Sequence, residues 1–140
     1  MIKSNKSIEK LENDYWEDLA YDSYVVQTCQ KARRKPISQL SEEEIRLLIG
    51  QKIGLKYLLP IALSIVKENP FVEITFFEGD LLVQLLRLSY SDWKDNREEL
   101  ESLKIIVKGN LEEIKALREK DNELIDGVLS IGLEEEKDND

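Results

Sequence analysis

The sequence predicts an all-α fold, a single-domain helical bundle around a central buried helix at about residues 53–68. Three observations support this prediction. The segment from Ile53 to Val66 is apolar at ten of its fourteen positions. Apolar residues recur at helical spacing on both sides of it, and helix-capping residues separate these amphipathic segments. The length of 140 residues suits one ordinary domain that buries a core without disulfide or metal staples.

The central segment carries its few non-apolar side chains on one narrow stripe, formed by Lys56, Pro60, Ser64 and Lys67. Because a helix that is apolar almost all round is a buried one, we expect neighbouring helices to cover everything except this stripe. Pro60 has no N–H, so the carbonyl oxygen of Lys56 lacks its helical hydrogen-bond donor, and we expect water to donate to it. We expect the helix to kink or restart at this point. The segment is shorter than the roughly 20 apolar residues of a membrane span, and no membrane crossing is expected.

The N-terminal third predicts a short helix within 6–13 and a longer one within 23–34. Ser7 is an N-cap candidate for the first of these helices. The second ends at a basic cluster, Lys31, Arg33, Arg34 and Lys35. Cations at a helix C-terminus meet the negative end of its dipole, which explains the cluster better than a nucleic-acid patch in so acidic a chain.

Residues 12–18 mix acidic side chains with Tyr15 and Trp16. One interpretation is a loop whose two aromatic rings plug the edge of the core. The other is an acidic, aromatic contact surface for a partner. The sequence leaves both interpretations open.

Ser41 and Glu44 have the spacing of a capping box and predict the start of a third helix. Gly50 and Gly54 bracket its junction with the central helix, where we expect them to permit close packing. Residues 71–77 are rich in β-branched and aromatic side chains. No second strand is evident, so we expect an ordered loop whose phenylalanines pack on the bundle, followed by a helix with Asp80 as its N-cap.

Two amphipathic helices are predicted in the C-terminal third, at roughly 97–108 and 111–130. Asn96 and Asn110 are their N-cap candidates. We expect one helical domain over 1–133. The last segment, 134–140, has six charges in seven residues and is expected to be a disordered acidic tail.

The composition argues against an enzyme. The chain has no histidine and one cysteine, Cys29. It therefore lacks the commonest general base, any disulfide and any paired-cysteine zinc site, and we expect no catalytic residues, no cofactor and no metal. Cys29 lies on an apolar face and is interpreted as a small core residue.

The formal net charge of −9 is concentrated late in the chain, since 15 acidic residues face 8 basic ones from Lys94 to the end. An acidic surface disfavours nucleic acid and anionic lipid and attracts a basic partner. The first ten residues contain three lysines and no apolar run typical of a signal peptide, so a cytoplasmic location is expected.

Acidic side chains in loops are the candidate partner contacts, because carboxylates on a rigid base suit bidentate pairing with arginine. The predicted contacts are Glu12, Asp14, Glu17, Asp18, Asp22, Glu73, Glu78 and Asp80. The alternative for the last three is two solvated loop charges and a helix cap.

Four motifs follow one another between Leu11 and Trp93: LENDYWED, KPISQL, IRLLIGQKIGLKYLLPIAL and EGDLL. In order and spacing they resemble the helical immunity proteins (CdiI type) of bacterial contact-dependent growth inhibition systems. The most specific part is LLIGQ followed by GLKYLLP; the C-terminal third is similar only as an amphipathic helical region.

The resemblance implies a small cytoplasmic antidote that binds the C-terminal toxin domain of a surface-delivered effector. Such toxins are often nucleases, whose active sites must be basic to hold phosphates. We therefore expect an immunity protein that occludes or charge-masks the toxin's active site. The alternative is an acidic helical adaptor or regulator that binds a basic host protein.

Overall fold

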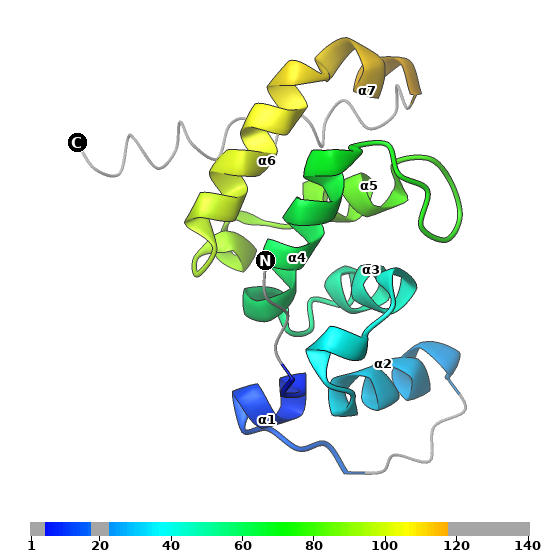
Figure 1. Ribbon diagram of the computed structural model, residues 1–140, viewed down its shortest axis with the longest axis vertical. Coiled ribbons are helices and arrows are strands. Elements are labelled where there is room, and N and C mark those ends of the chain that lie inside the picture. The colour runs from blue at the N-terminus through cyan, green and yellow to red at the C-terminus, as the bar shows by residue number, and fades with distance from the viewer. Residues whose placement is uncertain (1–4, 18–22, 118–140) are drawn as a thin grey trace, which may run out of the picture.

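The computed structural model describes residues 5–17 and 23–117, and within these ranges the chain is helical (Figure 1). The elements are α1 (Ile8–Glu12), α2 (Tyr24–Arg34), the 3-10 helix η1 (Ile37–Gln39), α3 (Glu42–Gly50), α4 (Leu55–Glu68), α5 (Asp80–Leu86), the 3-10 helix η2 (Tyr90–Trp93), α6 (Arg97–Gly109) and α7 (Leu111–Leu117). The described ranges contain no strand, only two isolated β-bridges. The predicted all-α single-domain fold is confirmed.

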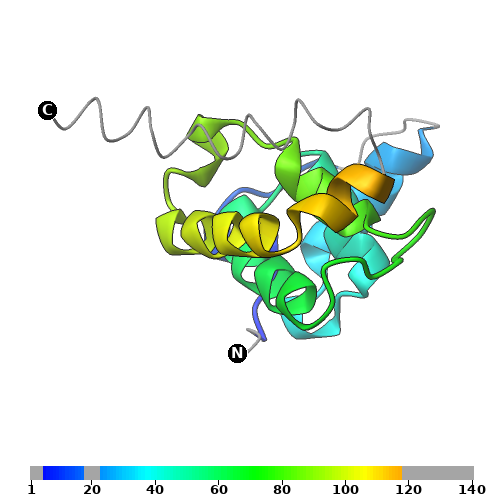
Figure 2. The same ribbon diagram turned by 90° about the horizontal axis from the view of Figure 1, so that it is seen from above.

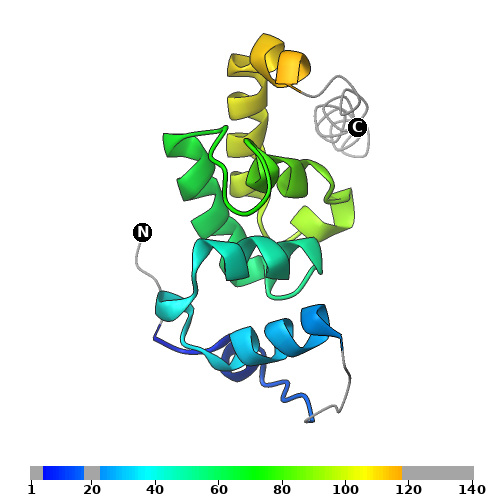
Figure 3. The same cartoon turned by 90° about the vertical axis from the view of Figure 1, so that its right-hand side faces the viewer.

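Helix α4 is the centre of the bundle, in contact with α3, α5 and α6. At the lower end of Figure 1, α2 packs on α3, and α1 packs on α2 and also meets α4, where the Tyr57 hydroxyl donates to the Leu11 carbonyl oxygen at 3.4 Å. At the upper end, α7 continues α6. Viewed from the side, the helices are stacked along the long axis in an order close to that of the chain (Figure 3). Viewed from above, α4 and α6 lie next to each other (Figure 2). None of the helices in the described ranges has both the length and the apolar composition that a bilayer crossing requires.

The predicted burial of the central helix is confirmed. Six side chains of α4 are fully buried: Leu58, Leu59, Ile61, Ala62, Leu63 and Val66. On the polar stripe, Lys56, Ser64 and Lys67 are exposed, while Pro60 is half-buried. The helix begins at Leu55, two residues later than expected, because Gly54 takes a left-handed N-cap conformation at φ 66°.

Of the two outcomes expected at Pro60, the restart is wrong and the kink stays a prediction. Helix α4 runs through Pro60 and does not restart there. The carbonyl oxygen of Lys56 accepts a hydrogen bond from Asn96 Nδ2 at 3.1 Å, where water was expected. The donor comes from the start of α6, forty residues away in the sequence.

The two predicted serine caps, Ser7 and Ser41, are present, and Ser23 is a third cap that was not predicted. Ser7 and Ser23 accept from backbone N–H groups in the first turns of α1 and α2. Ser41 forms the full capping box with Glu44 at the start of α3.

The aspartate and asparagine caps differ in part from the predictions. Gly79 is the N-cap of α5, and Asp80 is its first helical residue. Asn96 stands at the N-cap position of α6, but its side chain binds Lys56 and makes no cap hydrogen bond. Asn110 ends α6 and stands directly before α7, as predicted, and its carbonyl oxygen accepts from Ile114 N at 3.0 Å. Its side chain donates to the carbonyl oxygen of Ile106.

The two C-terminal helices are present as α6 and α7. The part of the second predicted helix beyond residue 117 and the acidic tail at 134–140 lie outside the described residues.

Candidate partner-binding surface

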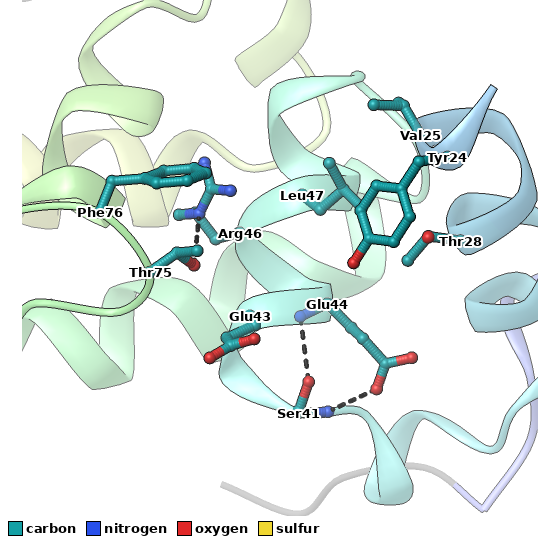
Figure 4. Close-up of a pocket in the computed structure, with 10 residues that line it drawn as sticks. All are labelled: Tyr24, Val25, Thr28, Ser41, Glu43, Glu44, Arg46, Leu47, Thr75 and Phe76. Atoms are coloured by element: carbon teal, nitrogen blue, oxygen red, sulfur yellow. Dashed lines mark hydrogen bonds between the residues drawn. The ribbon is translucent and has the colours of Figure 1, made fainter.

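A groove of about 490 Å³ lies where α2, α3 and the loop of residues 71–79 meet (Figure 4). Its lining comprises Tyr24, Val25, Thr28, Ser41, Glu43, Glu44, Arg46, Leu47, Thr75 and Phe76. Tyr24 and Phe76 are 77% and 71% exposed, and they stand at opposite ends of the groove (Figure 4). Two large aromatic rings left in water at one groove are unusual for a folded domain, because such rings bury most of their surface when they can.

The 71–79 loop owes its shape to Asp80. The side chain is only 2% exposed, and its carboxylate accepts from the backbone N–H groups of Ile74, Thr75 and Phe76 at 2.8, 2.8 and 2.9 Å. Burial alone would raise the pKa of this carboxyl, but the three donors and the nearby Arg46 outweigh burial and lower it. The carboxylate therefore stays charged at neutral pH and holds the loop in one conformation.

Arg46 ties the same loop to α3. Its guanidinium is buried, donates from Nε to Thr75 Oγ1 at 3.0 Å and lies 4.9 Å from the centre of the Phe76 ring. The loop is thus fixed at its base by Asp80 and on its inner side by Arg46. As predicted, residues 71–77 form an ordered loop and Phe71 packs against the core, but Phe76 points into solvent.

The first turn of α3 supplies the acidic side of the groove. Glu44 accepts from Ser41 N at 3.0 Å and from Lys35 Nζ at 2.9 Å, so its charge is balanced within the chain. Burial alone would raise the pKa of Glu44, but these contacts outweigh it and lower the pKa. Glu43 also lines the groove, is exposed, and has no ion pair with any described residue.

Two of the predicted contact residues, Glu73 and Glu78, lie at the neck of the 71–79 loop. Their backbones form an isolated antiparallel β-bridge, and both side chains are exposed. The structure therefore brings them together on the segment that carries Phe76. Asp80, the third predicted contact in this region, is buried, and its oxygens are occupied by the loop amides.

Two other predicted contacts, Glu12 and Asp14, face Arg33 of the same chain. The Arg33 side chain is buried, and its Nη2 lies 3.5 Å from Glu12 Oε1 and 3.7 Å from Asp14 Oδ2. It also donates to the Asp14 carbonyl oxygen at 2.6 Å, and its guanidinium lies 4.1 Å from the centre of the Trp16 ring. Arg33, expected only to complement a helix dipole, is thus the residue around which the acidic segment folds.

The 12–18 segment fits the core-plug interpretation only at Trp16, and the contact-surface interpretation stays a prediction. Trp16 packs against the core, whereas Tyr15 is 60% exposed. Glu17 is exposed, and its carbonyl oxygen accepts from Gln30 Nε2 at 2.8 Å. Asp18 and Asp22 lie outside the described residues.

Sequence reasoning missed Tyr24, Glu43 and Phe76 as surface residues. Tyr24 directly follows the Ser23 cap, so its position looks like an ordinary helix start. Glu43 lies in the first turn of α3, where an acidic side chain is expected because it complements the helix dipole. The available signals were an aromatic residue off the apolar face of a helix for Tyr24 and an aromatic residue in a loop for Phe76. Neither signal indicates a binding surface until the structure shows that both rings line one groove.

The described residues contain no group of three or more histidine, cysteine, aspartate or glutamate side chains arranged to hold a metal ion. Cys29 is 2% exposed, as predicted for a core residue, and burial raises the pKa of its thiol.

These features define a small all-α domain with a rigid groove bordered by exposed aromatic rings, an arrangement typical of protein-binding modules. A family model described as CDI immunity proteins matches residues 10–103. This match covers about two thirds of the chain, and the protein belongs to that family of contact-dependent growth inhibition immunity proteins. Searches of curated proteins and of solved structures gave no match to the chain.

Proposed function

We propose that this immunity protein acts in the cytoplasm and neutralises a nuclease toxin domain by covering its basic active site, without any chemical turnover. Membership of the CDI immunity family implies a cognate toxin as the partner. The nuclease activity and the mode of inhibition are our proposal. A nuclease must concentrate positive charge where it binds phosphates, so an acidic protein is complementary to its active site.

The observation that carries the proposal is the set of uncompensated carboxylates around the groove. Glu42 and Glu43 on α3, and Glu73 and Glu78 on the 71–79 loop, are exposed and have no ion pair with any described residue. Some other acidic side chains are paired within the chain, as Glu12 is with Arg33 and Asp92 is with Lys52. The net negative field around the groove would steer a basic partner towards it and raise the association rate.

The scaffold supports tight binding because its surface is formed before the partner arrives. Three backbone N–H groups fix the loop to Asp80, and a capping box fixes the start of α3. A surface that is already ordered loses little conformational entropy on binding. Slow release follows, and an antidote needs it because one free toxin molecule turns over many substrates.

The test is rescue of cells that express the toxin domain encoded beside this gene, together with nucleic-acid cleavage by that domain in vitro. We expect this chain to restore growth and to abolish cleavage in a 1:1 complex whose association slows as salt rises. The informative variant is Glu73→Lys with Glu78→Lys. Its matched control is Glu98→Lys with Glu112→Lys, which makes the same change in net charge at exposed first-turn positions of α6 and α7.

Charge reversal at the loop should slow association more than the same reversal on α6 and α7. Equal effects of the two double variants would contradict a local electrostatic surface. A toxin domain that cleaves no nucleic acid, or a complex in which cleavage continues, would overturn the proposed mechanism. Binding to a basic host protein in place of the toxin would favour the adaptor alternative.

A further inference from the structure

The groove between Tyr24 and Phe76 has the chemistry of a site for one cationic side chain. Val25 and Leu47 give it an apolar lining, and Glu43 lies at one side of it (Figure 4). The two exposed rings present π-faces, which attract a cation within about 6 Å of the ring centre. A long side chain with an apolar stem and a cationic end would place its stem on the apolar lining and its charge near the rings and Glu43.

The charges in the groove leave one negative group without a partner. Glu44 is paired with Lys35 at 2.9 Å. Arg46 faces the buried carboxylate of Asp80, and the attraction between them contributes to the low pKa of Asp80. Glu43 remains, exposed and unpaired among the described residues. The groove therefore has a net charge near −1 and favours a single positive guest.

Arginine fits better than lysine for two reasons. A planar guanidinium stacks on aromatic rings and binds a carboxylate through two parallel N–H groups, whereas an ammonium does neither. Phe76 already stacks on a guanidinium, that of Arg46 at 4.9 Å, and is still 71% exposed. The geometry of this loop thus suits guanidinium stacking, and the exposed ring surface is available for a second one.

We infer that the groove holds an arginine side chain of the toxin between Tyr24 and Phe76, with its guanidinium paired with Glu43. This inference rests on the proposed function, because the toxin supplies the arginine. It adds the position of a binding hot spot, since aromatic rings around a central arginine contribute most of the affinity in many protein interfaces.

The experiment measures the dissociation constant of the full-length chain for the toxin domain encoded beside it. Glu43→Gln and Tyr24→Ala should each weaken binding about tenfold or more. The matched controls are Glu98→Gln, an exposed acid in the first turn of α6, and Ile105→Ala, an exposed apolar side chain on the same helix. These controls should change binding by no more than about threefold. All four positions are exposed, and circular dichroism checks that each variant is folded.

A double-mutant cycle then identifies the guest. Each arginine of the toxin is replaced by alanine and tested against Glu43 and Glu43→Gln. One arginine should lose its contribution when Glu43 is changed, and lysine at that position should not restore binding. No coupling for any arginine, or full restoration by lysine, overturns the inference.

The failure of this inference is distinguishable from that of the proposed function. If the toxin is bound and neutralised while Glu43→Gln and Tyr24→Ala behave like their controls, the groove is not the arginine site and the immunity function stands. If the unaltered chain does not bind the toxin, the proposed function fails and the inference with it.

Discussion

Asn96 donates from Nδ2 to the carbonyl oxygen of Lys56 at 3.1 Å, and this bond replaces the one that Pro60 cannot make. In an uninterrupted helix the N–H of residue 60 would donate to that oxygen, but proline has no N–H. Asn96 is 5% exposed and stands at the start of α6. One side chain therefore satisfies an internal defect of α4 and fixes the position of α6 against it.

We predict that Asn96→Ala lowers the free energy of unfolding by about 1–3 kcal/mol, because it removes the only side-chain donor that the described residues offer to this oxygen. Urea denaturation monitored by circular dichroism measures the change. The control is Asn110→Ala, which removes a similar amide bond to the Ile106 carbonyl oxygen at a less buried position. A loss no larger than that of the control would contradict the assigned role of Asn96.

We also predict that substitutions at Asn96 and Pro60 are coupled, because both positions concern the Lys56 carbonyl oxygen. Pro60→Ala restores an N–H that can donate to Lys56, so Asn96→Ala should cost less in the Pro60→Ala background than in the unaltered chain. The two effects should differ by about 1 kcal/mol in a double-mutant cycle measured by urea denaturation. Strict additivity would show that Asn96 does not compensate for the proline.

Much of the fold follows from local sequence patterns, since the burial of α4 and the serine caps depend on neighbouring residues alone. The sequence also identified the Lys56 oxygen as a group in need of a partner. It did not identify Asn96, because the donor lies forty residues away and its position depends on how α6 packs. The buried roles of Arg33 and Asp80 were missed for the same reason, as charged side chains are expected at the surface unless tertiary contacts pair them.

The candidate site was predictable only in part. Loop acids such as Glu73 and Glu78 are evident from charge and position, but the groove is formed by segments far apart in sequence. Tyr24 and Phe76 line the same groove only because α2 and the 71–79 loop both pack on α3. No local pattern contains that information.

We predict that Asp80→Asn destabilises the protein by on the order of 3 kcal/mol at neutral pH. The substituted amide keeps one acceptor but turns an NH₂ group towards the backbone donors of the 71–79 loop. Equilibrium urea unfolding at pH 7 measures the loss. The control is Asp95→Asn, which changes the same side chain at an exposed position.

The pH dependence of this loss has a definite sign. The folded pKa of Asp80 lies below its ordinary value of 3.8, so the carboxylate contributes its full stability above that value. As the pH falls below 3.8, the unfolded chain takes up the proton first and the contribution declines. The stability difference between the unaltered chain and Asp80→Asn should therefore be constant from pH 7 to about 5 and shrink below pH 4. A difference that grows on acidification would contradict the assignment.

We predict that Arg33→Lys costs about 2 kcal/mol, although the charge is kept. Lysine cannot stack on Trp16 as the planar guanidinium does at 4.1 Å, nor hold Glu12, Asp14 and the Asp14 carbonyl oxygen together. The adjacent and exposed Arg34→Lys should change stability by less than about 0.5 kcal/mol. Urea denaturation compares the two, and equal effects would mean that Arg33 acts only as a charge.

Alanine substitutions at two glycines with positive φ distinguish the cost of backbone strain from the cost of steric overlap. Gly54 and Gly79 both have positive φ, at 66° and 80°. A Cβ at Gly54 would lie 2.8 Å from Ile8 Cδ1, whereas a Cβ at Gly79 would meet nothing within 4 Å. We predict that Gly79→Ala costs about 1 kcal/mol through backbone strain alone, and that Gly54→Ala costs about 2–4 kcal/mol because α1 must also move.

Ile8→Val tests that account, since it removes the Cδ1 atom that a Cβ at Gly54 would meet. In the unaltered chain Ile8→Val should destabilise by about 1 kcal/mol, because it leaves a small cavity in the core. In the Gly54→Ala background the same change should be neutral or stabilising, because it relieves the overlap. Equal costs of Ile8→Val in both backgrounds, measured by urea denaturation, would show that close packing of α1 is not what requires glycine at position 54.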